Sequence, residues 1–309
     1  MQEEKSKWVK YGAIFAILIM VGSGVFVGLM YWDGLTGDEN ATIEYPFADV
    51  PGTHANFTFK NAKDAAQYVP EDVLSINILK VYDNDTIDQT LQTSFPGAEP
   101  ARLLTASYLT GGLEYVVLES EENVSIVLNG SKPQYEDYED YNIIFISPYQ
   151  RVIAGNPLII ASFYNYVADN SLAKKAVDVL AGKSAGSTTL NDILEYADDT
   201  ETYDEIIVYK ANNGSNYEKY YQRSSQYVNM TTFQLAFQLE SIILNPNDEM
   251  KQAVYDLAEN ASEGIEFTIT EEDNVMKTYV DGADYTSFMT DTNALYKLIS
   301  DHTKQSTTA

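Results

Sequence analysis

The stretch TFQLAFQL, residues 232–239, decides the fold more directly than any other part of the sequence. Every second residue in it is large and apolar, namely Phe233, Leu235, Phe237 and Leu239. Successive side chains of a strand point to opposite faces, so this alternation is typical of a half-buried strand in an antiparallel sheet. We therefore expect a sheet with one face against a hydrophobic core.

Two hairpins are predicted elsewhere in the chain. The pair Gly111-Gly112 separates two strand-like runs, and glycines favour the tight turns that join antiparallel strands. Residues 265–270 and 275–280 form a second pair of runs around a polar turn. Further strands are expected over residues 56–59, 74–82, 142–147, 151–155, 157–162 and 205–210.

Helical periodicity occurs between the strands. In residues 171–180 the apolar side chains recur every three or four positions, and Gly182 favours a helix end. Asn61 and Asn247 are each placed to cap a helix. Hairpins mixed with helices predict an α+β fold with a mostly antiparallel sheet, compatible with two related halves that meet near residue 141. Helices are expected over residues 61–68, 171–180, 188–196, 248–261 and 291–300.

One N-terminal transmembrane helix is expected before this domain. Residues 11–32 are 22 residues without a charge, and a helix of that length spans about 33 Å, enough for a hydrocarbon core of about 30 Å. Trp8 and Trp32 bracket the stretch, where aromatic rings favour the membrane interfaces. Because lysines precede it and acids follow it, the positive-inside rule places residues 1–10 in the cytoplasm and residues 33–309 outside the cell.

The apolar stretch is interpreted as an uncleaved signal anchor. A cleaved signal peptide is the alternative, but its apolar region is normally shorter and ends in small residues, whereas this one ends in Met-Tyr-Trp. Gly24 and Gly28 form a G-x-x-x-G pair, which allows close approach of two membrane helices. They are candidates for helix pairing in a homodimer, although glycine is also common in membrane helices.

Glycosylation sequons support export. The triplet N-x-S/T is more frequent than composition predicts, and all its copies follow the apolar stretch. This excess is typical of an N-glycosylated surface protein, the alternative being chance in a chain rich in Asn and Thr. The candidate acceptors are Asn40, Asn56, Asn84, Asn123, Asn129, Asn213, Asn229 and Asn260.

Composition excludes several classes of function. A net charge of −27 repels nucleic acid, and the absence of cysteine excludes disulfides, thiolate metal sites and cysteine nucleophiles. The only histidines, His54 and His302, fall in a spacer and in the tail. No nucleotide-binding, metalloprotease or nucleophile-elbow motif occurs. We therefore expect a protein without catalytic residues or cofactors.

Calcium is the one metal that the sequence suggests. Asp83 and Asp85 resemble the start of an EF-hand loop, but the glycine at position 6 is missing and position 12 is Ser94 rather than glutamate. Asp198 and Asp199 form a second acidic pair. These four aspartates are weak candidates for metal ligands, and solvated acidic loops are the alternative.

The domain organisation follows from these features. An acidic, tyrosine-rich stretch at residues 131–141 has no period and marks a candidate internal boundary. The expected order is a cytoplasmic tail (1–10), a transmembrane helix (11–32), an extracellular spacer (33–55), an extracellular domain (56–300) and a polar tail (301–309).

Two stretches carry a family resemblance. Residues 156–194 combine a strand with a helix of the form v-x-x-A-x-D-v-x-x-G, and residues 65–79 precede them. Both resemble uncharacterised exported domains of membrane-anchored archaeal surface proteins, of methanogen-like type. The resemblance implies an exported fold and no activity. The function we expect is a non-enzymatic envelope or accessory protein that binds a protein or glycan, and the alternative is a membrane-tethered solute- or calcium-binding module.

Overall fold

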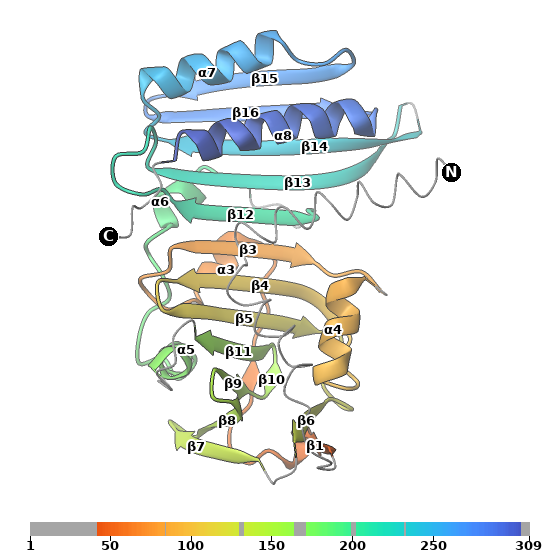
Figure 1. Ribbon diagram of the computed structural model, residues 1–309, viewed down its shortest axis with the longest axis vertical. Helices are drawn as coiled ribbons and strands as arrows, with labels where there is room; N and C mark the ends of the chain where they lie inside the picture. The colour runs from red at the N-terminus through yellow and green to blue at the C-terminus, as the bar shows by residue number, and fades with distance from the viewer. Residues whose placement is uncertain are drawn as a thin grey trace. The chain divides into compact units, whose positions relative to one another are not determined.

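The computed structural model describes residues 42–83, 85–129, 133–163, 171–198, 202–231 and 233–303 (Figure 1). These ranges contain sixteen strands and six α-helices, and the strands pair antiparallel except for one pair of two-residue strands, which is parallel. The protein is thus mostly antiparallel β. The expected class, α+β behind a transmembrane helix, is wrong for the part of the chain that the structure describes.

The membrane segment is the second part of that correction. No helix within the described ranges is long and apolar enough to cross a membrane. Residues 11–32, with Gly24 and Gly28, lie outside the described residues. The anchor therefore stays a prediction from sequence.

The chain divides into two compact units. Among the described residues, the first comprises those from Thr42 to Thr58 together with those in Val81–Ser184, and the second comprises Phe59–Lys80 together with those from Ala185 to Thr303. The boundary expected near residues 131–141 falls inside the first unit. Each unit is built from discontinuous pieces of chain, which the sequence pattern did not indicate.

The first unit is built on one antiparallel sheet. Its strands follow the order β4 (Pro100–Tyr108), β5 (Gly111–Leu118), β11 (Leu158–Phe163), β9 (Gln150–Ile153), β8 (Tyr141–Ser147) and β7 (Gln134–Tyr138). Two small pairs accompany it: β1 (Thr42–Pro46) with β6 (Ser125–Asn129), and β2 (Ala55–Asn56) with β10 (Gly155–Asn156). The remaining elements are η2 (Phe47–Asp49), α4 (Thr86–Ser94) and α5 (Ser171–Leu180).

The core of the first unit lies on one face of this sheet. Leu91 of α4 and Ile126 of β6 pack there with Val116 of β5 and Ile160 of β11. The register explains the grouping, because Val116 and Ile160 follow the same alternation on neighbouring strands. Helix α5 contacts β5, β9 and β11 through its apolar stripe.

The acidic stretch at residues 134–138 forms a strand that contacts α5. It forms β7, which pairs with β8 in a hairpin. Lys174 of α5 lies 2.6 Å from Glu136, and the Tyr138 hydroxyl donates to Asp178 at 2.9 Å. These contacts explain why an acidic, tyrosine-rich segment adopts a regular strand.

The second unit repeats the design with a different topology. Its sheet has the order β15 (Ile265–Glu272), β16 (Val275–Gly282), β14 (Gln234–Leu244), β13 (Lys219–Asn229), β12 (Glu205–Lys210) and β3 (Ser75–Lys80). Its helices are α3 (Ala62–Ala66), α6 (Asn191–Leu194), α7 (Asp248–Glu259) and α8 (Tyr285–Asp301).

Helix α8 covers the apolar face of the second sheet. It contacts β14 and β16, and α7 packs against α8 and β15 (Figure 1). Tyr220, Ile243 and Met276 face this helical layer from three adjacent strands. The opposite face carries Lys219, whose ammonium group pairs with Asp192 of α6. The two faces of the sheet are therefore covered by different helices.

A buried carboxyl group lies in the core of the first unit. Glu114 of β5 is 3 % exposed and pairs in register with Thr105 and Ile160. Its face of β5 also carries Val116 of the apolar core. Because burial disfavours the charged form, the pKa of Glu114 rises to about 7.

This raised pKa predicts a pH-dependent stability of the first unit. The contribution of Glu114 is fully present below its ordinary pKa of about 4.5 and is lost as pH rises through about 7. We expect the first unit of the wild type to lose about 3 kcal/mol of stability between pH 5 and pH 8, and Glu114→Gln to abolish this loss. Hydrogen exchange of the β5 amides in the full chain measures the stability of the first unit. It thereby separates the effect of Glu114 from that of Glu205 in the second unit, where burial also raises the pKa of the carboxyl group to about 7. Equal losses in wild type and variant would contradict the prediction.

Candidate functional site

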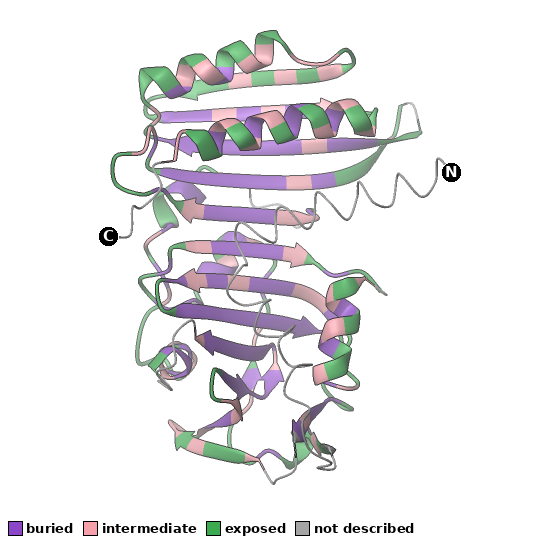
Figure 2. Ribbon diagram, viewed as in Figure 1, coloured by how far each residue is buried: buried purple, intermediate pink, exposed green. Residues whose placement is uncertain are grey.

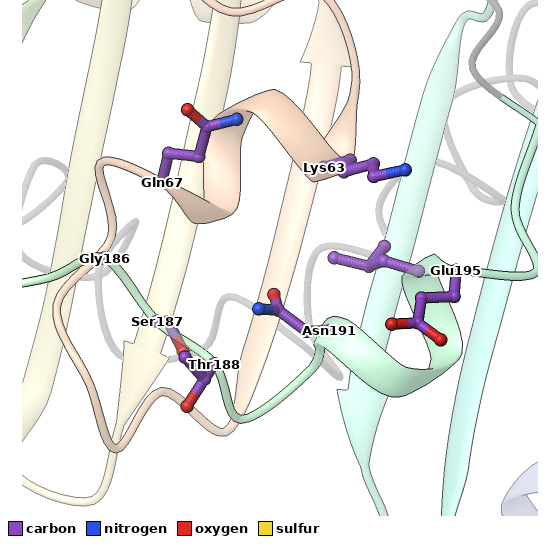
Figure 3. A pocket seen from close by; sticks show the side chains of 8 residues that line it. Lys63, Gln67, Gly186, Ser187, Thr188, Asn191 and Glu195 are labelled. Carbon is purple, nitrogen blue, oxygen red and sulfur yellow. The ribbon is translucent and has the colours of Figure 1, made fainter.

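A polar pocket of about 310 Å³ lies in the second unit between α3 and the segment that leads into α6 (Figure 3). Backbone contacts build it: the Ser187 amide donates to the carbonyls of Ala66 at 2.9 Å and Val69 at 2.6 Å. At Gly186 a Cβ atom would lie 2.2 Å from the Gln67 carbonyl oxygen, so only glycine allows this approach. The pocket is thus a fixed feature of the backbone.

A carboxylate from another loop fastens the same segment. Glu71 accepts hydrogen bonds from the Thr188 amide, at 2.8 Å to Oε2 and 3.0 Å to Oε1. The Thr188 hydroxyl donates to the same carboxylate. Because the amide and the hydroxyl of Thr188 both donate to Glu71, residues 186–188 keep their position beside α3.

The side chains that line the pocket are suited to bind small polar solutes. Lys63 and Glu195 supply opposite charges, and Gln67 and Asn191 supply amides (Figure 3). All four side chains are exposed, which weakens their interactions with any ligand relative to buried groups. Glu195 is the single carboxylate among the lining residues, so the pocket offers no pair of carboxyl groups for acid–base catalysis.

A buried ion pair lies on the face of the second sheet that carries Lys219. Arg223 of β13 donates through Nε to Glu240 of β14 at 2.9 Å, and its Nη1 donates to the Thr202 carbonyl at 3.3 Å. The Tyr279 hydroxyl donates to the other Glu240 oxygen at 3.2 Å. Burial and the neighbouring Glu240 raise the pKa of Tyr279 to about 12. Both charges are satisfied within the protein, so the pair is structural.

The suggested calcium ligands are not brought together. Asp85 caps α4, with its side chain accepting from the Asp88 amide at 2.8 Å. Asp83 is exposed, and Asp198 lies 3.7 Å from Arg223. Asp199 lies outside the described residues. Within the described ranges no cluster of three or more metal-ligating side chains occurs.

The sequon asparagines differ in exposure. Asn229 is half-buried, and its side-chain oxygen accepts from the Thr231 amide at 2.9 Å. Asn40 and Asn84 lie outside the described residues, as does the side chain of Asn129. The exposed acceptors are Asn56, Asn123, Asn213 and Asn260.

The β13–β14 hairpin extends past its neighbours in the sheet. Eleven residue pairs join the two strands. The pairing of β12 with β13 ends at Ser224, and the pairing of β16 with β14 ends at Phe237. The part beyond, residues 225–231 and 233–236, is called the hairpin tip below.

Most residues of the hairpin tip are exposed (Figure 2), and five of them have large apolar side chains. No residue between 225 and 236 is charged, although 21% of the chain is Asp, Glu, Lys or Arg. Contiguous exposed apolar patches on soluble domains mark contact sites. The exposed fractions are 37% for Tyr227, 54% for Val228, 76% for Met230, 76% for Phe233 and 48% for Leu235.

Phe233 also has an unusual backbone conformation. Its φ is +55°, in the left-handed region, where a bulky side chain costs about 1–2 kcal/mol relative to the right-handed one. The Phe233 amide donates to the Asn229 carbonyl at 2.7 Å, which closes the turn. Glycine or asparagine suits this position better. An exposed aromatic ring is therefore held where the fold itself favours a small residue.

The alternating pattern of residues 232–239 predicted Phe233 and Leu235 on the buried face of a strand, and this prediction is wrong because both side chains are exposed. The sequence does carry one indication of this site, the run of twelve uncharged residues from 225 to 236 in a strongly acidic chain.

Comparison with known proteins adds no family to this description. No protein-family model matches the chain, and no curated protein matches its sequence. The resemblance to archaeal surface proteins thus stays a prediction, and the geometry of the hairpin tip and of the pocket carries the functional argument.

The buried ion pair yields a test of unit stability. We expect Arg223→Met to destabilise the second unit by about 3–5 kcal/mol, because it leaves Glu240 buried without its counter-charge. Arg223→Met combined with Glu240→Leu should recover most of this loss. Urea unfolding of the full chain in detergent compares wild type, Arg223→Met, Glu240→Leu and the double variant. Losses of the two single variants that add up in the double variant would argue against a coupled pair.

Proposed function

We propose that the chain is a non-enzymatic surface protein, held at the cell membrane through residues 11–32, that binds a partner outside the cell through its hairpin tip. The N-terminus lies in the cytoplasm and the folded units lie outside. One observation carries the proposal: Phe233 is 76% exposed and sits in a left-handed backbone conformation at the end of an uncharged hairpin.

The ring of Phe233 costs the fold free energy in two ways. An exposed phenylalanine loses the free energy of burying its apolar area, and the left-handed backbone adds a further cost. Outliers of this kind cluster at sites that contact ligands or partners. The adjacent Met230 and Leu235 extend the apolar surface, so the ring belongs to a patch.

The pocket supports a second candidate function, the binding of a small polar solute. Lys63 and Glu195 could hold the two charges of a zwitterion, and a volume of about 310 Å³ lies at the lower end of ligand sites. Thermal unfolding of the full chain with millimolar free amino acids tests it. A rise in Tm that Glu195→Gln abolishes would support this function, and no rise with any amino acid would exclude this ligand class.

The leading proposal is tested by photo-crosslinking in native membranes. A photoreactive amino acid replaces Leu235, one residue of the apolar patch. We expect a crosslinked adduct, protein or lipid, whose yield falls at least tenfold when Met230 and Phe233 are both changed to Ser, because the patch that binds the partner is then lost.

The matched control is Leu109→Ser. Leu109 is 85% exposed in the turn between β4 and β5, so this variant removes an equally exposed apolar side chain far along the sequence from the hairpin tip. It should leave the adduct unchanged. An adduct that persists in the Met230/Phe233 double variant would contradict the proposed function.

A further inference from the structure

We infer that the partner of the hairpin tip is the outer surface of a zwitterionic lipid bilayer, into which Phe233 and Met230 insert. The inference rests on the proposed function, since it names what the same site binds. Three properties of the tip favour lipid over a protein surface: the distribution of its apolar side chains, its lack of charge and its small area.

The apolar side chains of the tip point in several directions. Tyr227 and Val228 are consecutive in β13, so they lie on opposite faces of the hairpin, and both are exposed. Leu235 pairs with Val228, and Phe233 and Met230 lie at the turn. A protein groove contacts one face of a hairpin, whereas a fluid layer surrounds it.

The distribution of charge sets a depth for insertion. Residues 225–236 carry no charge, and charged side chains are the ones that a hydrocarbon layer excludes most strongly. At the base of the tip the Tyr227 hydroxyl donates to Asp281 at 2.7 Å. Tyrosine rings favour the headgroup level, so Tyr227 marks the boundary between the inserted part and the aqueous part.

The small apolar area of the hairpin tip and its unpaired strand edges allow only shallow insertion into the bilayer. The five exposed side chains offer on the order of 500 Å² of apolar surface, less than the roughly 800 Å² per partner of a stable protein interface. Beyond Ser224 and Phe237 the outer edges of β13 and β14 have no neighbouring strand among the described residues. Unpaired backbone groups are costly in hydrocarbon, so only the turn enters the membrane.

The net charge selects the lipid. With −27 charges, the protein is repelled by anionic headgroups, while zwitterionic headgroups carry no net charge to oppose it. At such a surface, apolar contacts are sufficient to drive insertion of the tip. Insertion also requires a bare Asn229, because a glycan on the tip would hold the turn away from the bilayer.

Tryptophan fluorescence tests the inference in the full chain. Trp8 and Trp32, the only tryptophans, are changed to Phe, and Phe233→Trp provides a single reporter. In phosphatidylcholine vesicles with brominated acyl chains, we expect at least twofold stronger quenching of this reporter than of Leu109→Trp in the same background. Quenching should decrease when anionic lipid replaces phosphatidylcholine. Equal quenching of the two reporters, or a glycan on Asn229, would overturn the inference.

The two experiments separate the inference from the proposed function. If Phe233→Trp is not quenched but position 235 forms a protein adduct that the Met230/Phe233 variant loses, the inference fails and the proposed function stands. If the reporter is not quenched and no adduct forms, both fail. Quenching together with a lipid adduct supports both.

Discussion

The pairing of β13 with β14 is the constraint on which the second unit depends. Its eleven residue pairs set the register that places Tyr220 and Ile243 against α8 and brings Arg223 opposite Glu240 on the other face. A shift of one residue would exchange the two faces and bury charges in the apolar core. The same register extends the hairpin beyond β12 and β16, so the core and the exposed tip have one origin.

Local signals predicted much of the structure. Residues 171–180 and 205–210 have the predicted bounds, because a clean helical period and an apolar run with a turn on each side are strong local signals. Asn61 and Asn247 cap their helices as predicted, each accepting an amide hydrogen bond three residues on. The turn expected at Gly111-Gly112 was placed two residues too late, since it lies at residues 109–110 and both glycines belong to β5.

What the sequence could not predict depends on distant contacts. Alternation in residues 232–239 identifies a strand but not which positions have a covering layer: Phe237 and Leu239 are buried under α8, and Phe233 lies beyond it. Asp85 suggested a metal site because an N-cap and a calcium ligand use the same carboxylate. The strand β7 was missed because two of its side chains find their partners on α5, which is distant in sequence: Glu136 pairs with Lys174, and the Tyr138 hydroxyl donates to Asp178.

The central claim is that Phe233 is retained for contact with a partner and not for the fold. The most direct measurement is the free energy of unfolding of Phe233→Gly in detergent, compared with wild type. Glycine relieves the left-handed backbone and removes an exposed ring, so the account predicts equal or higher stability, by up to about 1 kcal/mol. A loss of more than about 1 kcal/mol would show that the ring supports the fold, and would contradict the account.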